Sequence, residues 1–318
     1  MRQLCLDMVY ESAKKDPRIF FIGSDLGVGT LQKFKEEMPE RFLMEGVNEA
    51  NIIGMAAGLG LEGKIVYVNT IATFLSRRCF EQIVLDVCLH NVNVRLIANG
   101  GGLVYAPLGP THLAIDDIGI LRTIPNMTIV APADESEMAR LMPLTVDYAG
   151  PIYIRLGKGN EPILTPDHIP FQIGKAISMR EGNDALIITT GVTLKAALDA
   201  AEILNKQGLK AAVLHVHTIK PLDTDAIMKY AAVVPVIVTV EEHTLMGGLG
   251  SAVAELVAEA NFNPAKRFKR IGIPDVFPEQ YGSQESLMAL YDITAENVAG
   301  VVAGLSQQRR ELLQKVGA

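Results

Sequence analysis

Residues 44–60 read MEGVNEANIIGMAAGLG, the most informative stretch of the chain. One carboxylate, Glu49, stands at the start of a predicted helix that otherwise contains small and apolar residues. A carboxyl group sheltered at such a position can hold or release a proton near neutral pH, and the glycines and alanines after it let a large group lie close. We therefore predict a proton-handling acid beside a flat cofactor. A surface glutamate next to a well-packed helix is the alternative, which this stretch alone leaves open.

The composition is that of a soluble globular protein. The 318 residues are enough for two domains, with 49% hydrophobic and 20% charged side chains. The net charge of −7 argues against a general nucleic-acid binder. No apolar run approaches the ~20 residues that span a bilayer, and Asp7 lies where an export signal would be apolar. The chain has three cysteines without metal-ligand spacing, which predicts buried thiols and a reduced, cytoplasmic setting: Cys5, Cys79 and Cys88.

Short β-branched runs alternate with amphipathic stretches along the first half of the chain. We expect strands at Ile19–Ile22, Ile65–Val68, Val94–Ala98, Thr128–Ala131 and Ile152–Arg155. We expect helices at Met1–Lys15, Asn48–Gly60, Arg77–His90, Ile115–Thr123 and Asp134–Tyr148. This alternation predicts an α/β fold with a mostly parallel sheet and helices on both faces.

A second α/β unit follows a proline-containing loop at Gly157–Pro170. Its expected strands are Ala185–Thr190, Ala211–His217, Val236–Val240 and Phe268–Ile273. Its expected helices are Thr193–Gln207, Asp223–Ala232, Gly248–Ala260, Ser283–Leu290 and Thr294–Lys315. We therefore divide the chain into a domain at 1–160, a linker at 161–175 and a domain at 176–318.

Four glycine-containing segments differ in what they predict. Gly58–Gly63 matches G-x-G-x-x-G but closes a helix instead of opening one, and Gly247–Gly250 lacks the third glycine, so neither indicates a nicotinamide site. Gly100–Gly102 follows a predicted strand and either leaves room for a ligand or forms a flexible turn. Gly109–His112 is stiffened by a proline and presents a histidine, either toward the same cleft or as a structural side chain.

Glu49, the glycine run and the Gly-Pro-Thr-His loop, in this order, resemble the pyrimidine-binding domain of the transketolase family. Further segments resemble landmarks of that domain: Gly23–Leu26, Thr73–Leu75, Arg78–Ile83, Leu121–Met127 and Pro132–Asp134. Others resemble the family's C-terminal domain: Thr189–Thr193, Thr218–Asp223, Val240–His243 and Gly247–Gly248. The resemblance covers the chain from about Phe20 to Gly304, and the joint order is more specific than any single motif.

The resemblance implies a site that binds thiamine diphosphate. It implies that Glu49 hydrogen-bonds the aminopyrimidine ring and favours its imino tautomer, and that His112 contacts the substrate oxygen and assists proton transfer. It places three further residues near the cofactor: Asp25, Phe74 and Phe80. Either of the two phenylalanine rings could be the one that stacks on the pyrimidine. It implies substrate contacts at Arg78, Asn99, His112 and Lys158. Ordinary core aromatics and solvated surface cations are the alternatives for these phenylalanines, Arg78 and Lys158.

One family segment is missing from this sequence. The superfamily holds the diphosphate through a divalent metal bound by a Gly-Asp-Gly…Asn segment, which does not occur here. The resemblance therefore implies the carboxy-terminal subunit of a split transketolase, with no metal ligand of its own. A companion subunit would hold Mg²⁺ or a similar ion and the diphosphate, in a heterotetramer of two plus two.

The substrate loop departs from the family pattern. Common transketolases have an acidic run before Pro-Thr-His, whereas residues 104–109 read VYAPLG without an acid. The resemblance implies transfer of a two-carbon ketol unit from an anionic ketose to an aldose. With this loop, a branched, deoxy or sulfonated sugar fits as substrate as well as a common pentose phosphate does. The beta subunit of a 2-oxo-acid dehydrogenase, a deoxyxylulose-phosphate synthase-like enzyme and a regulatory or scaffold subunit are the alternatives.

Overall fold

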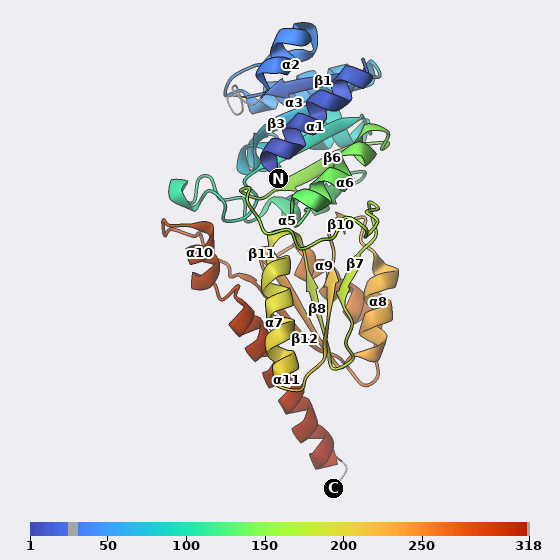
Figure 1. Cartoon of the computed structure of the whole chain (residues 1–318), viewed down its shortest axis with the longest axis vertical. Coiled ribbons are helices and arrows are strands. Elements are labelled where there is room, and N and C mark those ends of the chain that lie inside the picture. The colour runs from blue at the N-terminus through green and yellow to red at the C-terminus, as the bar shows by residue number, and fades with distance from the viewer. Residues whose placement is uncertain (25–30, 317–318) are drawn as a thin grey trace.

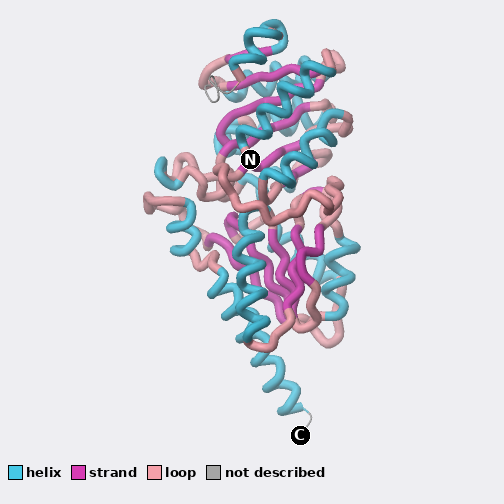
Figure 2. The backbone as a smooth tube through the Cα atoms, viewed as in Figure 1, coloured by secondary structure: helices cyan, strands magenta, loops and turns pink. Residues whose placement is uncertain are grey.

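The computed structural model describes residues 1–24 and 31–316 and has an α/β fold built on two sheets (Figure 1). The first sheet has seven strands in the order β10-β5-β6-β4-β3-β1-β2, and the second has five in the order β12-β11-β8-β9-β7. The two sheets lie one above the other along the long axis, and helices flank each of them (Figure 2). The predicted α/β class is confirmed.

Six strands of the first sheet come from the first half of the chain and run parallel to one another. They are β1 (Ile19–Gly23), β2 (Phe42–Met44), β3 (Ile65–Ile71), β4 (Val94–Asn99), β5 (Thr128–Val130) and β6 (Ile152–Leu156). All five strands predicted for this half are confirmed, and β2 was not predicted. Because the strands are parallel, their carboxyl ends lie along one edge, where ligands bind in open α/β sheets.

Helices cover both faces of this sheet. They are α1 (Arg2–Lys15), α2 (Gln32–Glu37), α3 (Glu49–Leu61), α5 (Asp117–Arg122) and α6 (Glu135–Val146). Neighbouring strand residues point to opposite faces: Phe21 packs in the cluster with α1 and α6, whereas Ile22 packs in the cluster with α3 and α5. Near-continuous burial along the strands explains why they read as apolar runs in the sequence.

The helix predicted at Arg77–His90 is instead a broken segment that begins earlier. It contains the π-helical turns η2 (Phe74–Arg78) and η3 (Ile83–Leu89), separated by the short α4 (Phe80–Gln82). π turns are wider than α turns and occur frequently at functional sites. Arg77 and Arg78 in the first of these turns have different partners, which are described below.

The second sheet is parallel except for its edge strand β7. Its strands are β7 (Ile177–Arg180), β8 (Ala185–Thr189), β9 (Ala211–His215), β11 (Val236–Thr244) and β12 (Arg267–Ile273). Its helices are α7 (Leu194–Lys206), α8 (Thr224–Val233), α9 (Leu249–Glu259), α10 (Gln284–Leu290) and α11 (Ala295–Val316). α7 and α11 pack in one buried cluster and α8 and α9 in another, so this sheet is also covered on both faces. The four predicted strands and five predicted helices are confirmed; β7 was not predicted.

The two halves of the chain are joined by shared structure. β10 (Thr218–Lys220) belongs to the second half of the chain, yet it pairs antiparallel with β5 as the edge strand of the first sheet. Arg155, which is 6% exposed, donates to Asp117 at 2.8 Å and to the backbone oxygen of Glu242 at 2.9 Å. These contacts hold the carboxyl ends of the first sheet against the second.

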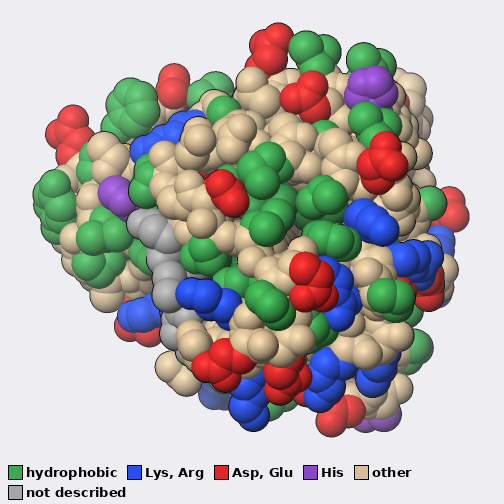
Figure 3. Space-filling model, turned by 90° about the horizontal axis from the view of Figure 1, so that it is seen from above, with side chains coloured by type: hydrophobic (Ala, Val, Ile, Leu, Met, Phe, Trp, Pro, Cys, Tyr) green, Lys and Arg blue, Asp and Glu red, His purple; other side chains and the backbone are tan. Residues whose placement is uncertain are grey.

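On the end of the molecule drawn in Figure 3, acidic and basic side chains are interspersed, so no large patch of this face carries charge of one sign. Within residues 1–24 and 31–316, no helix combines the length and the apolar character that crossing a membrane requires.

Candidate active site

Glu49 is the first residue of α3 and is 4% exposed. Its Oε2 accepts a hydrogen bond from Arg78 Nη1 at 3.2 Å. Its Oε1 is buried and has no hydrogen-bond partner among residues 1–24 and 31–316. The predicted burial of this carboxylate is thus confirmed, and one of its oxygens is available to a group that the chain does not itself supply.

A row of side chains leads away from Glu49. The Arg78 guanidinium lies over the Phe74 ring, 3.7 Å from its centroid, which is a cation–π contact. The Phe74 ring lies edge-on to the His112 ring at 5.3 Å between centroids, and the Tyr105 ring is 6.5 Å from that of His112. The structure therefore brings together four residues expected at the site, from three segments of the chain, and Tyr105 continues the row.

The two neighbouring arginines of η2 have separate roles. Arg77 pairs with Asp116 at 2.9 Å and donates to the Leu113 backbone oxygen, which ties η2 to the loop before α5. Arg78, expected from the resemblance to contact the substrate, instead bonds Glu49 in this structure. Because a guanidinium is planar and cationic, it can both stack on a ring and donate to a carboxylate.

The two candidate aromatic residues lie in different surroundings. Phe74 contacts Arg78 and His112, on the side where Glu49 lies. Phe80 is half-buried and packs against the hydrophobic cluster under α3. The geometry therefore favours Phe74 as the ring that faces a ligand and Phe80 as a packing residue.

The other expected residues are placed as follows. Asn99 is 1% exposed, and its Nδ2 donates to Asn69 Oδ1 at 2.6 Å and to the Thr70 backbone oxygen at 3.1 Å, so its amide group ties β4 to β3. Lys158 is exposed on the wall of a cavity that also contains Gly100. Asp25 lies outside the residues that the structure describes.

The glycine run lies against three side chains, although Gly100 also lines a cavity. A Cβ at Gly100 would lie 2.1 Å from the Tyr105 ring, one at Gly101 would lie 2.5 Å from Arg155, and one at Gly102 would lie 2.4 Å from Glu242. Gly100 and Gly102 also have positive φ angles of 75° and 64°. The glycines are required because three side chains pack directly on this turn.

Glu242 is a buried residue that the sequence reasoning did not single out. Its Oε1 accepts from the Leu103 backbone N–H at 2.8 Å and from Gln284 Nε2 at 2.9 Å. Burial raises its pKa from 4.5 to about 7. Because Leu103 follows the glycine run, this carboxyl group fixes the turn that leads to Tyr105.

The segment Gly247–Gly250 binds a carboxylate of the chain itself. The Leu249 and Gly250 backbone N–H groups, at the start of α9, each donate to Glu241 at 2.7 Å. A helix N-terminus attracts anions, and here Glu241 already occupies it. The bond to Glu241 therefore accounts for the glycines of this segment, and no bound nucleotide is needed to explain them.

The prediction that the three cysteines are buried thiols is confirmed. Cys5, Cys79 and Cys88 are buried and free, and burial raises the pKa of each thiol to about 12. In the part of the chain that the structure describes, no group of three or more His, Cys, Asp or Glu side chains could hold a metal ion.

Two family models match the chain. Transketolase, pyrimidine binding domain, matches residues 1–162, and Transketolase, C-terminal domain, matches residues 174–298. This chain is a member of the transketolase family. It has the pyrimidine-binding and C-terminal domains in the order that the sequence motifs predicted.

Two curated relatives of similar length are named as transketolase subunits. The chain is 36% identical over 303 residues to "6-deoxy-6-sulfo-D-fructose transketolase subunit SqwH" of Clostridium sp. (strain MSTE9), covering 92% of this chain and 94% of that protein. It is 37% identical over 299 residues to one of the subunits of an apulose-4-phosphate transketolase from Phocaeicola vulgatus, covering 93% and 94%.

A solved structure supports the same assignment. A protein described as "Split gene transketolase, inactive beta4 tetramer" superimposes with a TM-score of 0.88 and 33% sequence identity, covering 96% of this chain and 98% of that one. The family member described here thus has the fold of a split-gene transketolase subunit over nearly its whole length.

Proposed function

We propose that this chain is the cofactor-activating subunit of a split transketolase that transfers a two-carbon ketol unit from a ketose to an aldose. The observation that carries the proposal is the buried Glu49 Oε1, which has no partner among the described residues. Arg78 connects this carboxylate to Phe74, and Phe74 contacts His112. A buried carboxylate oxygen is costly unless a ligand satisfies it, and here the ligand would be the aminopyrimidine ring.

The residues present fit thiamine diphosphate. Glu49 would hold a ring nitrogen and control its proton, and Phe74 would offer an aromatic face for the ring. When bound, the cofactor supplies the nucleophilic carbon and the electron sink for cleavage next to a ketose carbonyl. His112, whose Nδ1 lies 2.8 Å from Thr111 Oγ1, would contact the substrate oxygen and move a proton there.

The proposal includes a companion subunit that holds the diphosphate and Mg²⁺, in a heterotetramer of two plus two. The relatives named as subunits support a companion, and so does the family structure described as an inactive tetramer of one chain type. We also propose that the chain divides into a domain at 1–160, a linker at 161–175 and a domain at 176–318. So does a cytoplasmic location, which the free, buried cysteines support.

An anionic ketose is the proposed donor. The two relatives that are transketolase subunits are named for a sulfonated and a phosphorylated sugar, and Lys158 lies exposed at the carboxyl end of the sheet. The loop of residues 104–109 carries no acid, so it would not repel a negatively charged sugar.

The test is reconstitution. The purified chain is mixed with a companion that carries Gly-Asp-Gly…Asn, with thiamine diphosphate and Mg²⁺, and is assayed with ketose plus aldose or with a 2-oxo acid. Ketol transfer without carbon dioxide release is expected. Carbon dioxide release from the 2-oxo acid without an aldose would instead favour a dehydrogenase subunit, and release coupled to joining of the remaining two carbons to the aldose would favour a synthase-like enzyme. No turnover with any companion would favour a regulatory subunit.

A further inference from the structure

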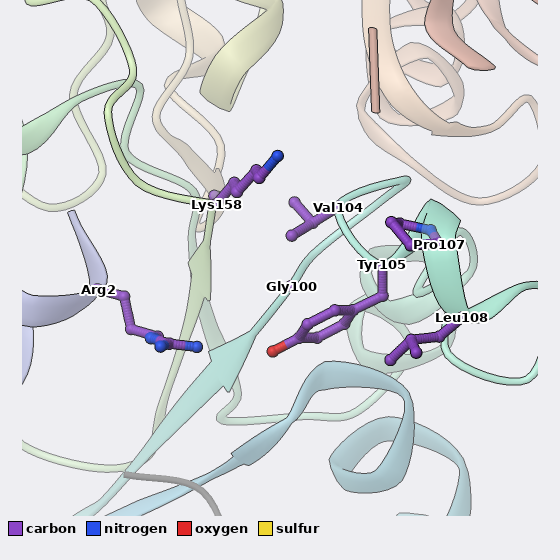
Figure 4. Close-up of a pocket in the computed structure, with 8 residues that line it drawn as sticks. Arg2, Gly100, Val104, Tyr105, Pro107, Leu108 and Lys158 are labelled. Carbon is purple, nitrogen blue, oxygen red and sulfur yellow. The ribbon is translucent and has the colours of Figure 1, made fainter. Parts of the chain in front are cut away.

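The loop at residues 103–113 joins the glycine run to the segment before α5, and it carries Tyr105 and His112. Its ends meet, because the Gly102 N–H donates to the Ala114 backbone oxygen at 2.9 Å and the Ala114 N–H donates back to Gly102 at 3.0 Å. Figure 4 shows the Tyr105 side chain extending from this loop toward the end of β4. A loop with a closed base can present functional side chains in fixed positions.

The apolar side chains of this loop pack on the second sheet. Leu103, Ala106 and Leu113 are fully buried, in one cluster with residues of β8, β11 and α7 from the second half of the chain. Just after the loop, the Ile115 backbone oxygen accepts from the Thr244 N–H at the end of β11, at 2.7 Å. The loop belongs to the first half of the chain, yet the second sheet supports it.

Glu242 of β11 provides a polar contact in the same place. It is 2% exposed, and its Oε1 accepts from the Leu103 N–H at 2.8 Å and from Gln284 Nε2 at 2.9 Å. The carboxyl group also lies against Gly102, where a Cβ would be 2.4 Å from Glu242 Cδ. Because Leu103 is the first residue of the loop, this carboxyl group fixes the direction in which the loop leaves the glycine run. An apolar replacement would leave the buried Leu103 N–H without its acceptor.

A second contact holds the loop beyond Tyr105. The Tyr281 ring, from the segment between β12 and α10, lies on Gly109, where a Cβ would be 2.9 Å from the ring. Gly109 has a φ angle of 76°, and its backbone oxygen accepts from the His112 N–H at 3.0 Å. The loop is thus held on both sides of Tyr105, and the turn that presents His112 starts at the residue that Tyr281 contacts.

The side of the site that would bind the coenzyme is supported differently. Glu49 begins α3, whereas Phe74 and Arg78 lie on η2. The apolar side chains of α3 and η2, such as Ile53 and Leu75, pack in the cluster between α3 and the first sheet. The two sides of the proposed site therefore rest on different hydrophobic clusters, so a change at one cluster should spare the other side.

We propose that the second sheet positions the sugar-binding side of the site, and that Glu242 is the positioning residue that fixes the 103–113 loop for transfer of the ketol unit. This inference rests on the proposed function, which supplies the sugar. Glu242 acts through Leu103 and the loop and does not itself contact the sugar. Its removal would displace His112, and a misplacement of about 1 Å in a site can lower a rate about a hundredfold.

The first test measures the loop in the chain alone, without catalysis. Hydrogen exchange followed by mass spectrometry compares Glu242→Ala with Glu241→Ala, the neighbouring carboxylate that holds the start of α9. Glu242→Ala should speed exchange over residues 103–113 at least about tenfold and leave α3 unchanged. Glu241→Ala should speed exchange at the start of α9 and leave the loop unchanged. Wild-type exchange of the loop in Glu242→Ala would overturn the proposal.

A surface variant decides the same point if Glu242→Ala does not fold. Tyr281 is 70% exposed, so Tyr281→Ala should fold, and it should speed exchange between Gly109 and His112. Phe277→Ala removes an exposed aromatic side chain of the same segment and is the matched control. With Glu242→Ala unfolded, equal exchange of the loop in these two variants would overturn the proposal.

The second test uses the reconstituted enzyme. Glu242→Ala should lower kcat/KM for the ketose at least about tenfold, while the affinity for thiamine diphosphate stays within about twofold of the wild type. Glu242→Gln keeps an acceptor oxygen for Leu103 and should restore most of the turnover. Equal losses of coenzyme affinity and turnover, or no rescue by Glu242→Gln, would show a merely structural role and overturn the proposal. If the wild type transfers no ketol unit with any companion, the proposed function fails, while hydrogen exchange still decides whether Glu242 holds the loop.

Discussion

Arg78 Nη1 donates a 3.2 Å hydrogen bond to Glu49 Oε2, so a guanidinium that is 49% exposed holds a carboxylate that is 4% exposed. The same guanidinium covers the Phe74 ring. A flat heterocycle that stacked on Phe74 and bonded Glu49 would need the position that Arg78 has in the isolated chain. If the coenzyme binds as proposed, we expect Arg78 to move off the Phe74 ring toward solvent, which its partial exposure allows.

Arg78→Ala leaves both oxygens of Glu49 without a partner. We expect the free energy of unfolding of the isolated chain to fall by about 1 kcal/mol, a modest amount because Arg78 is half-exposed. In the Glu49→Gln background the loss should be smaller, since a neutral amide needs no cation. Urea unfolding of the four proteins measures both values, and Arg77→Ala, which removes a surface pair with Asp116, is the matched control. Equal losses in the two backgrounds would refute the coupling.

Substitutions of Phe74 and Phe80 should have different effects on coenzyme binding and on stability. Phe74→Leu should weaken thiamine diphosphate binding by the reconstituted enzyme roughly two- to tenfold, because an aromatic contact is lost. Phe80→Leu should leave coenzyme binding near the wild-type value and lower stability, because Phe80 packs on the core. Titration of the coenzyme followed by activity, together with thermal unfolding, distinguishes them. The reverse pattern would assign the stacking role to Phe80.

Glu242 makes stability depend on pH. Its pKa is raised from 4.5 to about 7 in the folded chain, so between these values the folded state binds more protons than the unfolded state, and stability falls as pH rises. Glu242→Gln keeps the acceptor oxygen without this titration. The variant should gain stability relative to the wild type by roughly 3 kcal/mol between pH 4 and pH 8. Denaturant midpoints at four pH values measure the difference, and a constant difference would contradict it.

The sequence predicted most elements of the fold because buried parallel strands form continuous apolar runs. Three short strands were not predicted. The first is Phe42–Met44, which leads into the stretch around Glu49; the second is Ile177–Arg180, a partly exposed edge strand. The third, Thr218–Lys220, is defined by its pairing with Thr128–Val130 across the two halves of the chain. No local sequence pattern indicates a pairing between strands so far apart in the chain.

Part of the candidate site could be predicted from the sequence. Glu49 was recognisable because a lone acid begins a helix of small residues, and His112 because a proline-stiffened loop presents it. The position of Arg2 on the wall of the cavity beside Gly100 could not be predicted, because only the packing of α1 on the sheet brings it there. The glycine run was visible, but its reason, close contact with Tyr105, Arg155 and Glu242, requires the coordinates.

The role of Glu49 is tested most directly by the turnover of Glu49→Gln in the reconstituted complex, compared with Glu45→Gln, an exposed residue just before it. The account predicts that Glu49→Gln folds, assembles and loses at least about a hundredfold in kcat, while Glu45→Gln keeps wild-type turnover. Wild-type kcat for Glu49→Gln in a correctly assembled complex would contradict it.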